Sequence, residues 1–287
     1  KYQTPVLLRP TTRVCHGCAS IEMDESRKKI TPEGFVKDSK WVIFPRLTYQ
    51  NHKKVEARQP VLGEDFSSYR FNEVTGGGKK GIAAGGVSVA YAKEALAQVG
   101  ECPKFFKVAT PHPFPERLAL SFLEGLDEVL VLEELDPVIE RELVYLCGKH
   151  HLPVKIMGKL TGHTQNAGEN STEAANAAIR SFLGLPQEES KQAPLPSLPV
   201  RPPVLCAGCP HRASFYAVKV AMKGKKAVFS GDIGCYTLGN ASPLDMVDTC
   251  LCMGAGVTVA QGLHRIEPDA VNFAFIGDST FFHTGIP

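Results

Sequence analysis

A proline-rich stretch divides this chain and limits what it can fold into. Residues 186–203 contain six prolines. Proline fixes φ and donates no backbone hydrogen bond, so such a stretch continues neither a helix nor the middle of a sheet. We therefore expect an extended linker at 186–203 with a separate domain on each side.

Before the linker, short apolar runs alternate with segments of helical spacing. The runs at 105–109 (FFKVA) and 129–132 (VLVL) have the composition of buried strands. Asp136-Pro137 then supplies a cap and a first-turn proline for a helix, and another short strand is expected at 154–157. This alternation predicts an α/β fold of parallel sheets, with helices on both faces in three layers.

The alternation resumes after the linker. Helical spacing and apolar runs predict a helix, a strand, a helix and a strand in turn, at 211–222, 227–230, 254–263 and 271–276. Near the start, residues 5–8 have the apolar character of a strand. Residues 9–75 have the mixed composition of an irregular connector.

Composition excludes several functional classes. Lys and Arg number 32 against 30 Asp and Glu, a net charge of +2, so no strong field attracts nucleic acid or an anionic membrane. No apolar run approaches the roughly 20 residues that a membrane span needs. Because the sequence shows no secretory signal, we expect a cytoplasmic protein.

Nine cysteines are the main departure from ordinary composition. An odd number without a secretory signal does not indicate a disulfide framework. Cysteines at close spacing are typical of zinc or iron–sulfur ligands, although buried, inert thiols have the same pattern. Seven of the nine gather in two groups: Cys15 and Cys18 near the start, and Cys206, Cys209, Cys235, Cys250 and Cys252 after the linker.

Asp278 follows the last predicted strand, in the sequence IGDS. Open α/β sheets bind ligands at the carboxyl ends of their strands, and a carboxylate there suits Mg²⁺. Gly277 allows close approach to the backbone. A plain turn at the end of a strand explains Gly-Asp as well, because both residues favour turns.

The sequence CAGCPHR at 206–212 places two thiols three residues apart before a helix. Such a pair can bind one metal or cluster, and Pro210 suits the first turn of the helix. His211 and Arg212 add donors for an anion at the helix N-terminus. The alternative is a capped helix start with inert cysteines.

The loop SGDIGCYTLG at 230–239 follows a predicted strand. A glycine-punctuated loop in this place can bind phosphate with its backbone N–H groups, and Cys235 adds a third thiol. The loop matches neither the GxGxxG nor the P-loop pattern, which disfavours a nicotinamide or flavin dehydrogenase. An ordinary βα loop is the alternative.

Taken together, CAGCPHR, SGDIGCYTLG and FIGDSTFFHTGIP resemble the thiamine-diphosphate-binding domain of the indolepyruvate ferredoxin oxidoreductase family, α subunit. The resemblance implies that residues 1–75 form the end of a pyrimidine-binding domain and a connector. Residues 76–185, with GGVSVAYAKEAL, resemble a transketolase C-terminal-like middle domain. After the linker, residues 204–287 resemble the first part of a thiamine-diphosphate-binding domain.

The resemblance also implies site residues. Asp278 is expected to bind Mg²⁺, and thiols matching Cys206, Cys209 and Cys235 hold a [4Fe–4S] cluster in related enzymes. The residues expected around thiamine diphosphate are Cys209, Pro210, His211, Gly234, Cys235, Tyr236, Thr237, Gly277, Asp278, Ser279 and Thr280.

The family's chemistry is the oxidative decarboxylation of aryl pyruvates through a thiamine diphosphate ylide. The resemblance implies that coenzyme A takes the acyl group, that electrons pass to ferredoxin, and that a smaller β subunit completes a hetero-oligomer. The glutamate that activates thiamine, and so the catalytic residue itself, is expected upstream of Lys1. A second Mg²⁺ ligand and ferredoxin-like cysteine runs are expected beyond Pro287. On this interpretation the chain is a fragment that is inactive alone.

A second hypothesis comes from a different functional class. A cysteine-rich metal-binding or assembly protein could use the same fold without catalysis. It would bind zinc or iron and no thiamine diphosphate, so metal analysis together with a thiamine assay separates the two.

Overall fold

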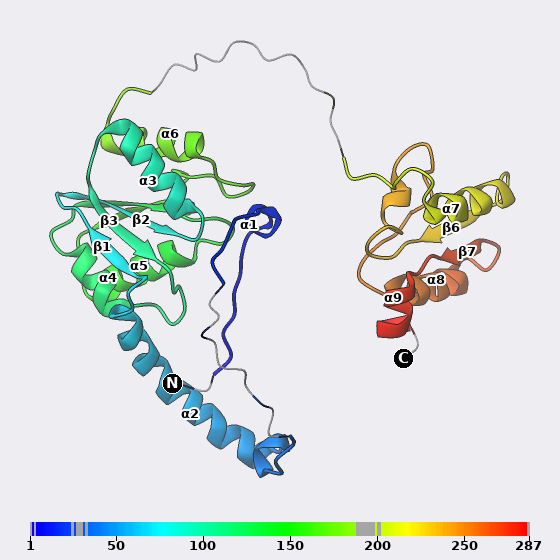
Figure 1. Cartoon of the computed structure of the whole chain (residues 1–287), viewed down its shortest axis with the longest axis horizontal. Coiled ribbons are helices and arrows are strands. Elements are labelled where there is room, and N and C mark those ends of the chain that lie inside the picture. The colour runs from blue at the N-terminus through cyan, green and yellow to red at the C-terminus, as the bar shows by residue number, and fades with distance from the viewer. Residues whose placement is uncertain are drawn as a thin grey trace. The chain divides into compact units, whose positions relative to one another are not determined.

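A computed structural model of the chain shows two compact units, Lys1–Lys191 and Gln192–Pro287 (Figure 1). The structure describes residues 4–23, 34–187 and 202–285, together with residues 2, 26, 31 and 199. The boundary between the units falls inside the proline-rich stretch 186–203. Most of that stretch, residues 188–198, 200 and 201, lies outside the described residues, so the linker stays a prediction.

The first unit is built on a five-stranded sheet in the order β1-β3-β2-β4-β5. Four strands run parallel, which confirms the prediction, and only β1 runs antiparallel, at the edge beside β3. The strands are β1 (Glu73–Thr75), β2 (Lys80–Gly85), β3 (Lys104–Val108), β4 (Glu128–Leu132) and β5 (Lys155–Met157). The sequence pattern missed β1, because three residues are too few to show a period.

Helices cover both faces of this sheet, as three layers require (Figure 1). Successive side chains of a strand point to opposite faces. Accordingly, Ala83 of β2 packs in one core cluster with α4 (Glu116–Leu123) and α5 (Val138–Lys149). Ile82 packs in the other, with α3 (Ser88–Val99) and α6 (Thr172–Leu183).

The segment before the sheet differs from its predicted irregular form. It contains α1 (Thr12–His16), the 3₁₀ turn η1 (Ser39–Trp41) and the 23-residue helix α2 (Pro45–Ser67). Prolines at both the first position and the interior of α2, together with its high polarity, conceal this helix in the sequence. Residues 5–8, expected as a strand, form none in this structure.

The second unit contains a parallel pair of strands, β6 (Ala227–Ser230) and β7 (Val271–Ala274). Its helices are α7 (Pro210–Ala221) and α8 (Ala255–Ile266), with the short turns η2 (Leu238–Asn240), α9 (Asp278–Thr280) and η3 (Phe281–Gly285). The order agrees with the sequence pattern, although β7 ends two residues earlier than expected. Its core holds the buried side chains of Leu205, Phe215, Met246 and Phe275.

Among the described residues, no helix is both long and apolar enough to cross a membrane.

Candidate functional site

The segment CAGCPHR forms a tight turn that leads into α7. Cys209 is the N-cap of this helix and Pro210 its first residue, as the sequence predicts. The Cys209 Sγ atom lies 3.0 Å from Nδ1 of His211. Arg212, which the sequence suggested as an anion donor, instead donates from Nε to the backbone oxygen of Cys206 at 2.9 Å. It therefore closes the turn that carries both thiols.

Tyr236 connects this turn to the loop after β6. Its ring centroid lies 4.7 Å from that of His211 and 5.5 Å from that of Phe215, both edge-on. It also stacks on Phe275, the residue after β7. Aromatic pairs at these distances and angles are favourable. The half-buried ring of Tyr236 therefore holds the first two motifs against the end of the last strand.

The loop after β6 is packed tightly at its start and open in its middle. A Cβ atom at Gly231 would lie 2.9 Å from the backbone oxygen of Tyr236, and one at Gly256 in α8 would lie 2.7 Å from the oxygen of Gly231. Gly234 has φ +100° and open space around its missing side chain. A backbone with this conformation needs glycine, and its open side can admit a ligand.

Thr237 makes contacts within the loop after β6, whereas Cys235 is exposed to solvent. The Thr237 hydroxyl donates to the backbone oxygen of Asp232 at 2.6 Å and lies 3.5 Å from the Cys250 thiol. It therefore stabilises the loop from within.

Asp232 is the residue that the sequence reasoning missed. It is only 1% exposed. Its Oδ1 accepts a hydrogen bond from the backbone N–H of Gly254 at 3.1 Å, and its Oδ2 accepts one from Gly277 at 3.0 Å. Burial raises the pKa of Asp232, but hydrogen bonds from Gly277 N–H, the Thr280 hydroxyl and Gly254 N–H outweigh it and hold the pKa below its ordinary value. The signal in the sequence was an acid within a glycine-rich loop directly after a strand.

Asp278 begins the short turn α9, after Gly277 as N-cap. Its side chain is exposed, and no described residue donates a hydrogen bond to it or pairs with it. Ser279 is exposed as well, whereas Thr280 is only 3% exposed and faces Asp232. The turn therefore presents one free carboxylate outward and holds one hydroxyl inward.

The chemistry of this donor set fits Mg²⁺ with a diphosphate. Magnesium takes few protein ligands and completes its octahedron with waters and phosphate oxygens. A single exposed carboxylate that follows the carboxyl end of one of two parallel strands is consistent with that preference.

The three thiols expected for an iron–sulfur cluster do not form a ligand set in this structure. Cys206 and Cys235 are exposed, and Cys209 is half-buried. Within the described part of the chain, no group of three or more His, Cys, Asp or Glu side chains is placed to hold a metal ion. The cluster stays a prediction, and we derive no step through it.

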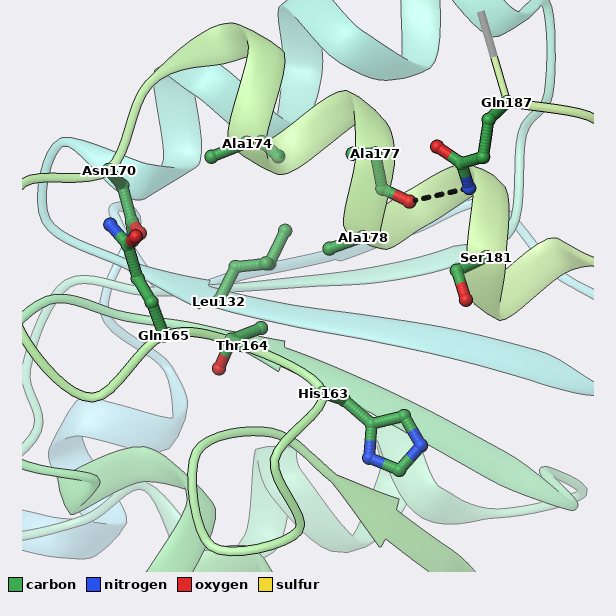
Figure 2. A pocket seen from close by; sticks show the side chains of 11 residues that line it. Leu132, His163, Thr164, Gln165, Asn170, Ala174, Ala177, Ala178, Ser181 and Gln187 are labelled. Carbon is green, nitrogen blue, oxygen red and sulfur yellow. Dashed lines mark hydrogen bonds between the residues drawn. The ribbon is translucent and has the colours of Figure 1, made fainter.

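The first unit contains a cavity of about 330 Å³ between the end of β4 and α6 (Figure 2). Leu132 lies at its floor, and the small alanine side chains of α6 line one side (Figure 2). Among the residues that the structure describes, the other lining groups are small or neutral polar side chains with His163, and none is an acid, a lysine or an arginine. None of the predicted site residues lines this cavity.

Comparison with protein families identifies the second unit. Residues 232–287 match the family described as thiamine pyrophosphate enzyme, C-terminal TPP binding domain. The matched region begins at Asp232 and includes Asp278.

Curated relatives match the whole chain. Indolepyruvate oxidoreductase subunit IorA of Methanothermobacter thermautotrophicus is 37% identical over 296 residues, which cover 100% of this chain and 47% of that protein. The subunit of the same name from Thermococcus kodakarensis is 36% identical over 316 residues, which cover 100% of this chain and 48% of that protein. The chain thus spans about half the length of the curated relatives it matches.

A solved 2-oxoglutarate:ferredoxin oxidoreductase from Magnetococcus marinus is also similar, with 19% identity and a TM-score of 0.34. The similarity covers 49% of this chain and 24% of that one. The identity to the curated relatives is much higher and extends over the whole chain. Over its whole length the chain is therefore similar to about half of the indolepyruvate oxidoreductase subunit IorA.

Proposed function

We propose that this chain supplies the diphosphate-binding part of a thiamine-diphosphate-dependent 2-oxoacid oxidoreductase. The observation that carries the proposal is the meeting of three motifs at the carboxyl ends of β6 and β7. Tyr236 holds the first two motifs together, and Asp232 holds the second to the third. The family match to residues 232–287 supports the same assignment.

In this proposal Asp278 would hold the Mg²⁺ that accompanies the diphosphate. The open backbone at Gly234 approaches the phosphates, and Ser279 lies beside the metal ligand on the same exposed turn. When bound, thiamine diphosphate supplies the nucleophilic carbon and the electron sink for decarboxylation. His211 lies in the first turn of α7, and its ring contacts Tyr236 of the loop after β6. Its imidazole is therefore proposed to lie near the diphosphate.

The names of the relatives suggest the substrate. We propose an aryl pyruvate of the indolepyruvate type, which loses its carboxyl group as carbon dioxide. Coenzyme A takes the acyl group as a thioester, and the electron pair released by this oxidation passes to ferredoxin. A smaller β subunit in a hetero-oligomer and a cytoplasmic location belong to the same proposal. The activating glutamate is not assigned to any residue of this chain.

The proposal includes no iron–sulfur cluster on this chain. The thiols of Cys206, Cys209 and Cys235 are not placed as a ligand set. Electron transfer to ferredoxin is therefore proposed for the assembled enzyme as a whole.

The test is thiamine diphosphate binding by the intact polypeptide that carries this chain, measured by calorimetry in the presence of MgCl₂. Asp278→Ala is expected to abolish binding, because it removes the carboxylate proposed to hold the metal. Asp248→Ala is the matched control, since Asp248 is also an exposed acid of the second unit and lies beside β6, where it accepts a hydrogen bond from Phe229 N–H at 2.8 Å.

Full cofactor affinity in Asp278→Ala contradicts the proposal. Wild-type polypeptide that binds zinc or iron but no thiamine diphosphate contradicts it too, and favours the metal-binding or assembly protein instead.

A further inference from the structure

We infer that Asp232 is the positioning residue that fixes Asp278, and that it acts by holding the residues on both sides of the metal-binding carboxylate. The inference rests on the proposed function and extends it to a buried residue that the proposal does not place at the metal or the cofactor. It starts from a buried carboxylate whose hydrogen bonds from Gly254 N–H and Gly277 N–H connect two separate segments of the chain to the loop after β6.

The contacts of Asp232 surround the turn that carries Asp278. One oxygen accepts from Gly277 N–H, the residue directly before Asp278, at 3.0 Å. Thr280, two residues after Asp278, turns its hydroxyl to the same carboxylate. The other oxygen accepts from Gly254 N–H at 3.1 Å, where α8 begins. A single side chain therefore holds the turn on both sides and anchors it to the neighbouring helix.

The turn has few other constraints of its own. It spans only Asp278–Thr280, and among the described residues no side chain bonds to Asp278. Phe281 N–H closes it by donating to the backbone oxygen of Gly277 at 2.8 Å and to that of Asp278. Asp232 therefore supplies the side-chain contacts to the residues on both sides of Asp278.

A carboxylate is the group that these donors require. Both of its oxygens accept, and neither donates. Asparagine has the same shape but presents an NH₂ group to Gly254 N–H or to Gly277 N–H, so one of the two hydrogen bonds is lost. A buried donor left without a partner then shifts or opens the turn.

The test is Mn²⁺ titration of the intact polypeptide in the presence of thiamine diphosphate, with free Mn²⁺ followed by electron paramagnetic resonance. Asp232→Asn is expected to raise the Kd for Mn²⁺ about tenfold, the size of effect seen when residues that orient a metal ligand are changed. Thr280→Val is expected to raise it as well, whereas Thr280→Ser keeps the hydroxyl and the wild-type Kd. Asp248→Asn, the matched control, leaves the Kd unchanged.

A wild-type Kd in Asp232→Asn overturns the inference, even if that variant is less stable to heat. Equal Kd values in Thr280→Val and Thr280→Ser overturn it too, and this pair decides alone if Asp232→Asn does not fold. Loss of binding in Asp278→Asn with unchanged binding in Asp232→Asn removes the inference and leaves the proposed function intact. Wild-type polypeptide that binds no Mn²⁺ with thiamine diphosphate overturns both.

Discussion

Tyr236 stacks on Phe275 with ring centroids 5.6 Å apart and an angle of 17° between the ring planes. The first residue belongs to the loop after β6, and the second follows β7. The pair therefore connects the two strand ends at which the candidate site lies. It also places the aromatic core of the second unit directly beneath the loop proposed to bind the diphosphate.

Tyr236→Ala is expected to destabilise the second unit around the ends of β6 and β7. Removing a large, partly buried ring costs about 2 kcal/mol or more, because the lost contacts leave a cavity. Hydrogen exchange followed by mass spectrometry should show faster exchange in peptides that cover β6 and β7. Tyr236→Phe keeps the ring and is expected to exchange like wild type. Equal protection in the alanine variant and the wild type would contradict this role.

Glu133 is expected to make the stability of the first unit depend on pH. Burial raises the pKa of Glu133 above its ordinary value of 4.5, although N–H groups of Glu140 and Ile139 at the start of α5 donate to its carboxylate. The folded state therefore holds a proton more tightly than the unfolded state. The stabilising contribution is present below the unfolded pKa and is lost as the pH rises through the raised folded pKa.

The measurement is urea unfolding of wild type and Glu133→Gln at a series of pH values, from below the unfolded pKa of Glu133 to above its raised folded pKa. The stability of wild type relative to the glutamine variant is expected to fall as the pH rises from below 4.5. A difference that stays constant with pH, or that grows in favour of wild type, would show that the buried carboxyl has no raised pKa.

Asn72 is expected to be important for the attachment of α2 to the sheet. Its side chain is 7% exposed. The Nδ2 group donates to the Phe66 oxygen at 2.8 Å, and Oδ1 accepts from Ala109 N–H at 2.7 Å. Asn72→Ala leaves these buried backbone groups without partners, at a cost of about 1–3 kcal/mol. Urea unfolding should show this loss, whereas Asn166→Ala, at an exposed position, should leave stability unchanged.

The thiols are expected to differ in reactivity. Burial raises the pKa of Cys147, a residue of α5 whose side chain packs in the core. A thiol that is both buried and protonated reacts slowly with alkylating reagents. Mass spectrometry after brief iodoacetamide treatment should therefore find Cys206 and Cys235, both exposed, modified well before Cys147. Labelling of Cys147 at the same rate would mean that this part of the core opens readily.

The sequence determined the class of fold and the motifs of the candidate site. Apolar runs such as 129–132 predicted buried parallel strands, because a strand covered on both faces needs no polar residues. Asp278 was placed at the end of a strand for a local reason, namely that it directly follows an apolar run. The order and spacing of the three motifs then indicated the family, which the curated relatives confirm.

Only the tertiary structure decided how these motifs are held together. Helix α2 was missed because its stability comes partly from contacts with α4 that no local period reveals. Asp232 and Thr280 were separated in the sequence reasoning, one passed over and the other assigned to the cofactor. The structure brings Thr280 and Gly277 to the buried carboxylate of Asp232. Hydrogen bonds between residues so distant in the chain depend on how β6 and β7 align, and that alignment is set by packing rather than by local sequence.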